Sequence, residues 1–416
     1  MRLFLAVFLT LIIGTTSLAQ DVKSVILLVG TGLGSVQLDL TRNYAGGTLN
    51  IDKLTEQGRL KTGSANSPVP DAAAAATALA TGSRTNNGLL SVLPSGEKLQ
   101  SVAQVMKNKG GKVGIVTTGL VTNPVCAAFY ANSLNSTDEA ALAEQALRSK
   151  IDLLVGGGRA AFRPVLFGGS RQDSRDLLLS AQIDGYTVAQ TWKAMEKAEG
   201  PKLLGLPVNG VFSYEIDRGK EGEQSLADLT KKALAQFDSE RFFLLVSGSR
   251  IGDACLQNDP AAMVLEILAF DQAVGVALEY AMRRPDVLVV VTSTYEAGGL
   301  LAATADIEYL KKINKSVEQM NRELAWDLSN LWDLLSFHAG FQELTIEEAQ
   351  LLSTIESSNA PYILSTLLNN RAGLLWTSQG PTGSSVPVFA AGSAAEIIVQ
   401  QQDQAGLGKA LKQVIQ

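Results

Sequence analysis

Six short runs of apolar and β-branched residues recur along the chain with amphipathic segments between them, and this alternation constrains the fold more than any other feature. The runs occupy residues 24–29, 113–118, 151–155, 242–246, 287–292 and 386–389. Helical periodicity appears around residues 99–109, 138–148, 226–237 and 261–282. Strands that alternate with helices predict an α/β fold whose mostly parallel sheet is buried on both faces. Ligand sites in such folds are built by the loops at the carboxyl ends of the strands, so functional residues are expected in those loops.

The composition is that of a globular protein and argues against two classes of partner. Of the 416 residues, 46% are hydrophobic and 18% are charged, which allows a large core in one domain with insertions or in two domains. The net charge is −6, and the chain has no concentrated run of Lys and Arg. Nucleic-acid binding and binding to anionic membranes both depend on such basic clusters. Neither partner is therefore expected.

Residues 1–19 have the pattern of a secretory signal peptide. Arg2 precedes an apolar stretch at 3–13, and small residues follow, with Ser17 and Ala19 in the positions before a signal-peptidase cut. We expect residues 20–416 to form the mature domain, in the periplasm or outside the cell. A retained membrane anchor is the alternative, although the apolar stretch is shorter than the ~20 residues of a membrane span. No later segment looks apolar enough to cross a bilayer.

Residues from about 303 to 370 differ from the rest of the chain because strand signals are scarce there. Helical stretches predominate, and Thr345 with Glu348 matches a capping box ahead of an apolar run. We expect a helical insertion before the final strand. The one histidine of the chain, His338, lies in this segment. Without partner ligands it is expected to have a packing or surface role.

A glycine-rich loop, Gly-Thr-Gly-Leu-Gly at residues 30–34, follows the first predicted strand directly. Asp52 lies at roughly the ~20-residue offset at which a dinucleotide-binding motif places its ribose ligand. The third glycine, however, comes one position too early for that motif. A dinucleotide site is therefore a weak interpretation.

A second interpretation joins this loop with the other strand ends. Residues 69–82, in which an alanine run follows Asp71, and residues 85–88 closely resemble the nucleophile helix of the alkaline phosphatase family. Further blocks resemble that family in the same order; they lie at 115–118, 127–131, 156–159, 248–251, 258–260, 290–292, 298–300, 376–377 and 386–389. The resemblance covers about residues 21 to 395. It implies a three-layer α/β fold with a central mostly parallel sheet, a zinc- and magnesium-dependent phosphomonoesterase, and a homodimer.

The chain departs from the family at each position that should hold a metal or attack phosphate. Where the resemblance implies a ligating aspartate in the glycine loop the chain has Thr31, and where it implies a serine nucleophile the chain has Ala72. Residues 132–139, which should supply a phosphate-gripping arginine, contain none. The remaining positions that the family uses around its metals also carry other residue types; they are Asn123, Val125, Ser247, Gly252, Leu256, Thr294, Tyr295 and Pro381.

These replacements predict a protein that keeps the fold of the family and lacks its phosphatase activity. Glycine, leucine, valine and proline side chains offer no lone pairs to zinc, and alanine cannot form a covalent phosphoryl intermediate. We expect no zinc or magnesium cofactor and no phosphatase activity, with a non-catalytic binding or structural role that could involve a protein partner. The alternative is a phosphoric monoester hydrolase with residual or altered metal-dependent activity. Its ligands would be Asp71, Asp253 and Glu296, which could at most suggest a magnesium or calcium site.

The remaining side chains around the former site allow two further expectations. Asp71 should cap the helix that begins with the alanine run. Cys126 and Cys255 lie on two loops that carry metal ligands in the family, and a disulfide between them across the former site is a hypothesis that their separation decides. The polar residues at the strand ends would either line a remaining cavity or bond to one another.

Overall fold

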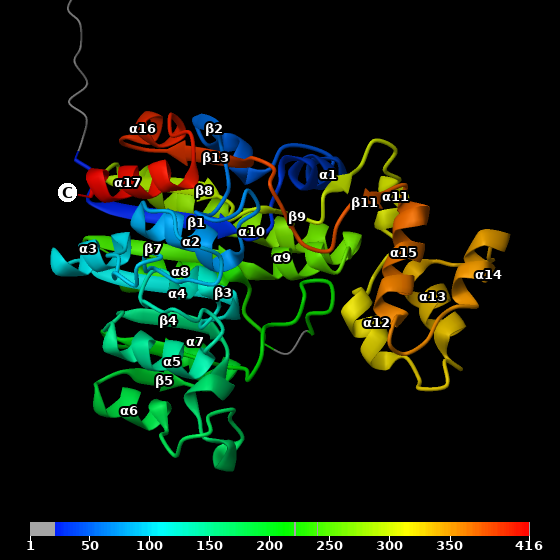
Figure 1. Ribbon diagram of the computed structural model, residues 1–416, viewed down its shortest axis with the longest axis horizontal. Helices are drawn as coiled ribbons and strands as arrows, with labels where there is room; N and C mark the ends of the chain where they lie inside the picture. The colour runs from blue at the N-terminus through cyan, green and yellow to red at the C-terminus, as the bar shows by residue number, and fades with distance from the viewer. Residues whose placement is uncertain (1–20, 220–221, 239, 416) are drawn as a thin grey trace, which may run out of the picture.

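The centre of the protein is a nine-stranded sheet, seen in a computed structural model that describes residues 21–219, 222–238 and 240–415 (Figure 1). The strand order is β2-β13-β8-β1-β7-β3-β4-β6-β5. From β8 to β5 in this order the strands run parallel, whereas β13 is antiparallel to both β8 and β2. The predicted signal peptide at 1–19 lies outside the described residues.

All six predicted strands are confirmed in this sheet. They are β1 (Ser24–Gly30), β3 (Lys112–Leu120), β4 (Leu153–Gly157), β7 (Phe242–Gly248), β8 (Val287–Thr292) and β13 (Val386–Ala391). The sequence did not indicate β2 (Glu56–Leu60), β5 (Thr187–Ala189) or β6 (Leu203–Gly205). β2 is a polar edge strand, and β5 and β6 are 3 residues long. Neither kind of strand contains enough apolar residues to show a strand period.

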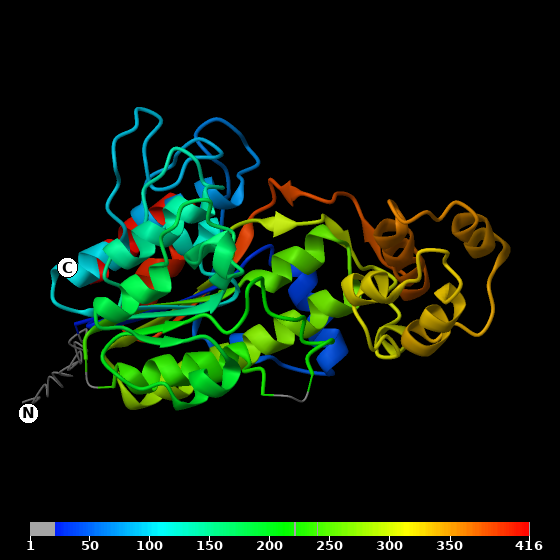
Figure 2. The same cartoon turned by 90° about the horizontal axis from the view of Figure 1, so that it is seen from below.

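Two helical layers cover the sheet, and the strands are apolar on both faces because their side chains alternate between the two layers. In β1, Ile26 and Leu28 belong to one core cluster, whereas Leu27 and Val29 belong to the other. The first cluster includes residues of α1 (Ser35–Ala45), α8 (Leu226–Gln236), α9 (Ser249–Leu256) and α10 (Pro260–Arg283). The second includes residues of α2 (Ala72–Thr81), α3 (Val102–Asn108), α4 (Pro124–Ala127), α5 (Glu139–Arg148), α6 (Leu177–Ile183), α16 (Ala395–Val399) and α17 (Gln404–Val414). Figure 2 shows the sheet between the two layers.

The four predicted helices are confirmed as α3, α5, α8 and α10, and α10 corrects one expectation. By length and composition α10 could cross a membrane, the one such helix in the described part of the chain. The expectation that no later segment is apolar enough was therefore wrong. In the structure, 67% of its most apolar window is buried. It packs against α8, β1 and β8, the arrangement of a core helix.

The helical segment before β13 stands beside the sheet rather than on it (Figure 1). It contains α11 (Ile307–Leu310), α12 (Val317–Glu323), α13 (Leu331–Ala339), α14 (Ile346–Leu352) and α15 (Ala360–Ala372). The predicted capping box at the start of α14 is confirmed, because the Thr345 hydroxyl accepts from the Glu348 amide and the Glu348 carboxylate accepts from the Thr345 amide. Two short antiparallel pairs, β10 (Leu300–Leu301) with β11 (Leu375–Trp376) and β9 (Glu296–Ala297) with β12 (Pro381–Thr382), join its base to the sheet.

Candidate functional site

The predicted site positions gather at the carboxyl edge of the parallel strands. Val29 of β1 lies opposite Ser247 of β7 on one side and Thr292 of β8 on the other. Thr31 and Thr294 follow the ends of β1 and β8 closely in the chain. Helix α9 begins directly after β7, and three residues separate the end of β3 from the start of α4, so the residues that carry the other positions lie at the same edge.

Thr31 and Gly252 are packed against each other at this edge. A Cβ atom built on Gly252 would lie 2.9 Å from the Thr31 Cγ2 atom and 3.2 Å from the Thr31 carbonyl oxygen. A Cβ on Gly32 would in turn lie 2.9 Å from the Gly252 Cα atom. Thr31 is 5% exposed. The space that a longer side chain at position 252 would need is therefore occupied by a methyl group and by backbone.

The end of β7 carries a buried chain of hydroxyl groups. The Oγ atom of Ser249 lies 2.9 Å from that of Ser247 and 3.0 Å from Oγ1 of Thr117, and Thr117 Oγ1 also accepts from the Gly119 amide at 3.0 Å. Burial raises the pKa of the neighbouring Cys126 thiol to about 12, although hydrogen bonds with Thr117 and Ser247 act in the opposite direction. This part of the site is uncharged at neutral pH.

The two cysteines lie on opposite faces of the sheet, and the disulfide hypothesis is wrong for this structure. Cys126, on α4, belongs to the core cluster on one face, whereas Cys255, on α9, belongs to the cluster on the other. Both are buried free thiols. Their loops approach from the two layers, so the sheet separates the sulfur atoms although the loops open at one edge. Burial raises the pKa of Cys255 well above its usual value, which also disfavours the thiolate that a metal would require.

Asp71 acts as the cap of α2, as predicted. Its Oδ1 atom accepts from the Ala74 amide at 2.8 Å, and its Oδ2 atom accepts from the Gly88 amide at 2.6 Å. Its own amide donates to the Asn87 side chain at 3.0 Å. Ala72 follows as the first residue of the helix and presents only a methyl group where the resemblance implies a nucleophile.

The other two carboxylates of the alternative metal site are also engaged. Glu296 accepts through Oε1 from Gln37 at 2.6 Å and from the Gly299 amide at 3.0 Å, and through Oε2 from Thr382 at 2.5 Å. Asp253 forms an ion pair with Arg250 at 2.7 Å. Gln37 was not indicated by the sequence, because it is separated from Glu296 by 259 positions and belongs to no motif.

The remaining positions fill the site with neutral groups. Tyr295 is 5% exposed, and burial raises its pKa, with smaller contributions from the charges of Asp253, Cys255 and Asp71. The buried hydroxyls of Thr31 and Thr294 have no hydrogen-bond partner within the described structure.

Four further predicted positions have structural roles. Asn123 caps α4 by accepting from the Val125 amide at 2.9 Å, and Val125 is fully buried. Leu256 packs on the core cluster that contains α9, and Pro381 pairs with Ala297 in the short strands β12 and β9. Each of these residues is held by packing or by backbone hydrogen bonds rather than directed toward a common point.

This donor set does not fit the zinc and magnesium ions that the resemblance implies. Thr31, Gly252 and Leu256 offer at most one hydroxyl among them, and zinc needs imidazole, thiolate or carboxylate ligands. Across the described ranges, no group of three or more His, Cys, Asp and Glu side chains is placed to hold a metal. His338 lies on α13, with its Nδ1 atom 2.7 Å from the Asn314 side-chain oxygen. The geometry supports hydrogen bonding to a neutral polar group, and Ala72 has no hydroxyl at the position where the resemblance implies the nucleophile.

Comparison with known proteins finds similarity along nearly the whole chain. The family model described as alkaline phosphatase matches residues 22–416. Alkaline phosphatase 4 of Bacillus subtilis is 29% identical over 416 residues, which cover 93% of this chain and 88% of that relative. The cold-active alkaline phosphatase from the psychrophile Shewanella sp. superposes with a TM-score of 0.85 at 28% identity, covering 94% of this chain and 100% of that chain. The Thermus thermophilus alkaline phosphatase gives a TM-score of 0.88 at 25% identity, covering 96% and 92%.

Proposed function

Because the chain belongs to the alkaline phosphatase family, we propose that it is an exported member that keeps the family fold, does not hydrolyse phosphate esters, and acts as a binding or structural protein. The observation that carries the proposal is the lack of space between Thr31 and Gly252. The family resemblance implies metal-binding carboxylates at both positions, but the chain has a threonine and a glycine there, and a Cβ atom at position 252 would lie 2.9 Å from the Thr31 methyl group. A divalent cation placed there would lose its hydration shell and gain no anionic ligand in exchange.

Ala72 supports the same proposal independently of the metals. A phosphoryl-transfer step needs a nucleophile and a group that stabilises charge on the transferring phosphoryl. Position 72 supplies a methyl group, and residues 132–139 contain no arginine. The proposal therefore includes the absence of zinc and magnesium cofactors.

Export and assembly form the less direct part of the proposal. The pattern of residues 1–19 supports secretion into the periplasm or the medium. A homodimer is proposed from family membership, because a two-fold interface can persist when an active site is lost. Light scattering of the purified mature protein tests the assembly, and a monomer at micromolar concentration would contradict it.

The decisive experiment is an assay of the mature protein, residues 20–416, on p-nitrophenyl phosphate with zinc and magnesium added. Alkaline phosphatase 4 of Bacillus subtilis, purified in the same way, serves as the active reference. We expect no turnover above the uncatalysed rate and no stoichiometric zinc by metal analysis. Turnover accompanied by bound zinc would overturn the proposal and favour the alternative of a metal-dependent hydrolase.

An Ala72→Ser variant separates the effect of the missing nucleophile from the effect of the missing metal ligands. The serine restores the nucleophile hydroxyl without restoring any metal ligand, so we expect the variant to stay inactive. If the variant hydrolyses the ester, the metal-binding part of the site is functional, and the proposed absence of zinc and magnesium is wrong.

A further inference from the structure

A cavity is lined by residues of α5 and α6 and of the segments that precede the short strands β5 and β6. Figure 1 shows these elements at the β5 end of the sheet. Its volume is about 590 Å³. Four cationic side chains line it, those of Arg148, Lys150, Arg175 and Lys202. They come from the end of α5, the segment before α6, and the residue that precedes β6. The fold therefore brings together four cations from separate parts of the chain.

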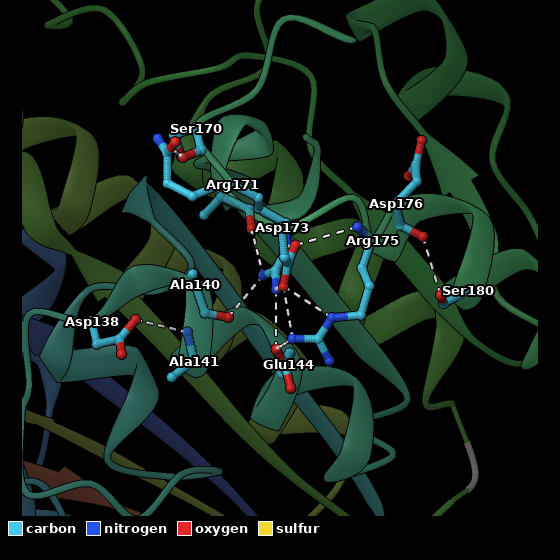
Figure 3. Close-up of polar contacts among 12 residues, drawn as sticks. Asp138, Ala140, Ala141, Glu144, Ser170, Arg171, Asp173, Arg175, Asp176 and Ser180 are labelled. Atoms are coloured by element: carbon cyan, nitrogen blue, oxygen red, sulfur yellow. Dashed lines mark hydrogen bonds and ion pairs between the residues drawn. The ribbon is translucent and has the colours of Figure 1, made fainter. Parts of the chain in front are cut away.

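The wall of the cavity beside α5 is fixed by a buried arginine (Figure 3). The Arg171 side chain is 1% exposed and donates to Glu144 at 3.0 Å and to Asp173 at 2.7 Å. It also donates to the Ala140 carbonyl at 2.9 Å. Arg175 bonds to the same two carboxylates. Hydrogen bonds from Arg171, then from Arg175, hold the pKa of Asp173 well below its usual value, so this carboxylate stays ionised and the cluster stays assembled.

The charges that line the cavity leave a positive excess. The cavity contains two carboxylates, Glu144 and Asp184, against its four cations. Glu144 is already shared by Arg148, Arg171 and Arg175, so its charge is compensated within the wall. The chain as a whole carries a net charge of −6. A positive concavity on an acidic protein concentrates anions locally and repels cations.

Two lysines face the cavity with ammonium groups that no ion pair occupies among the described residues. Lys202 lies with its Nζ atom 5.1 Å from the centre of the Tyr186 ring and 3.3 Å from the Asp184 carbonyl oxygen. The ring is itself fixed, because the Tyr186 hydroxyl donates to the Ile151 carbonyl at 2.7 Å. Lys150 lies two residues beyond the end of α5 and has a φ of 55°, a left-handed conformation in which glycine is favoured over lysine. A lysine is thus present at a position where its backbone conformation is unfavourable.

We propose that this cavity binds a small phosphoryl anion that carries an apolar or aromatic group. The lysine ammonium groups are compact charges that suit phosphate oxygens, whereas the guanidinium groups of the wall are already paired with carboxylates. Leu147, Leu177 and the Tyr186 ring give the cavity an apolar side against which a hydrocarbon group can pack. The site does not depend on the strand-end loops, so it is independent of whether the protein hydrolyses phosphate esters.

Calorimetric titration of the full mature protein with phenylphosphonate tests this proposal. The probe carries a phosphonate dianion and a ring, and its phosphorus–carbon bond is not an ester, so hydrolysis cannot consume it. The test variant is Lys150→Gln/Lys202→Gln. The matched control is Lys61→Gln/Lys98→Gln, which removes the same charge from two exposed lysines that do not line the cavity. Thermal melting of both variants establishes that they fold.

We expect the test variant to bind the probe about tenfold more weakly than the wild type and the control to bind within about twofold of it, because only the first loses charges that contact the anion. Equal affinity in the wild type and the test variant would overturn the proposal, as would equal weakening in both variants. A second arm uses phosphatidylglycerol vesicles, with phosphatidylcholine vesicles as the neutral reference. Lysine-dependent vesicle binding would identify a lipid headgroup as the source of the anion, and lysine-dependent probe binding without vesicle binding would identify a soluble ligand.

Discussion

The strand-end loops and the α5–α6 cavity differ in what has happened to their charged groups. At the strand ends, neutral residues occupy the positions where the family resemblance implies metal ligands, and the carboxylates Asp71 and Glu296 accept hydrogen bonds from the protein itself. At the cavity, cations and carboxylates form an extended network, and two lysines at its surface form no ion pair with any residue that the structure describes. Binding capacity needs charge that the protein has not already neutralised. By this criterion the cavity has charge available for binding a ligand, and the strand ends do not.

The largest effect is expected for the variant Arg171→Met, which tests whether the charged network at the cavity is a fixed structure. The substitution should destabilise the protein by about 3 kcal/mol or more. It removes the buried cation that joins Glu144, Asp173 and the Ala140 carbonyl. Among the described residues, the two carboxylates would then be paired only with Arg148 and Arg175, whose side chains are largely exposed. Urea unfolding measures the change. Arg148→Met is the control, because Arg148 pairs with the same Glu144 at 3.1 Å but its side chain is 74% exposed; we expect it to cost less than about 1 kcal/mol. Equal costs would mean that the wall of the cavity is not a fixed structure.

A carboxyl group outside both regions gives a pH-dependent test of how burial acts on charge in this fold. Glu266 on α10 accepts from the Glu215 amide at 2.8 Å, and burial, with the nearby charge of Glu215, raises its pKa to about 8 from 4.5. Below pH 4.5 both the folded and unfolded states carry this proton, and between 4.5 and about 8 the folded state alone does. The contribution of Glu266 to stability is therefore lost as the pH rises, by up to roughly 1.4 kcal/mol per pH unit.

Glu266→Gln should flatten the dependence of the free energy of unfolding on pH between about 5 and 8, because glutamine keeps the acceptor and does not titrate. The exposed Glu97→Gln is the matched control and should leave the slope unchanged. Urea unfolding at three pH values measures both slopes. An unchanged slope in Glu266→Gln would show that the Glu266 carboxyl does not retain its proton in the folded state.

The fold could be predicted from the sequence because its signals are local. Buried parallel strands are continuous apolar runs, and each of the six that were predicted lies in the sheet. β5 and β6 could not be predicted, since 3 residues are too few to show a period. The gathering of Thr31, Ser247 and Thr294 at one edge also follows from parallel topology, in which every carboxyl end faces the same way.

Side-chain partners could not be predicted, because they depend on which face of the sheet each helix covers. Cys126 and Cys255 occupy loops at one edge but belong to different layers, a distinction that no spacing in the sequence encodes. The bond from Gln37 to Glu296 joins residues 259 positions apart. The α5–α6 cavity could not be predicted either. Its four cations share no motif and become neighbours only through the pairing of β4, β6 and β5.

The packing at the strand ends can be tested by a double-mutant cycle between positions 252 and 31. Gly252→Ala should destabilise the protein by about 1–2 kcal/mol, because the new Cβ would lie 2.9 Å from the Thr31 methyl group, a clash that exceeds the gain in helix propensity. In a Thr31→Ala background the same substitution should cost less than half as much. Additive costs, measured by urea unfolding, would mean that the Thr31 methyl group does not close this position.

The smallest expected effect concerns Lys150, where stability and binding should change in opposite directions. With a φ of 55° at this position, Lys150→Gly should stabilise the protein by about 0.5–1 kcal/mol, since glycine adopts the left-handed conformation without steric cost. The same variant should bind phenylphosphonate more weakly, because it removes one cation from the cavity. Lys98→Gly is the control, since Lys98 is exposed and is not among the residues with positive φ; it should lose stability and keep its affinity for the probe. A gain in stability together with unchanged binding would mean that the Lys150 side chain does not contact the bound anion. The positive charge that binds the anion would then come from Lys202 and the arginines alone.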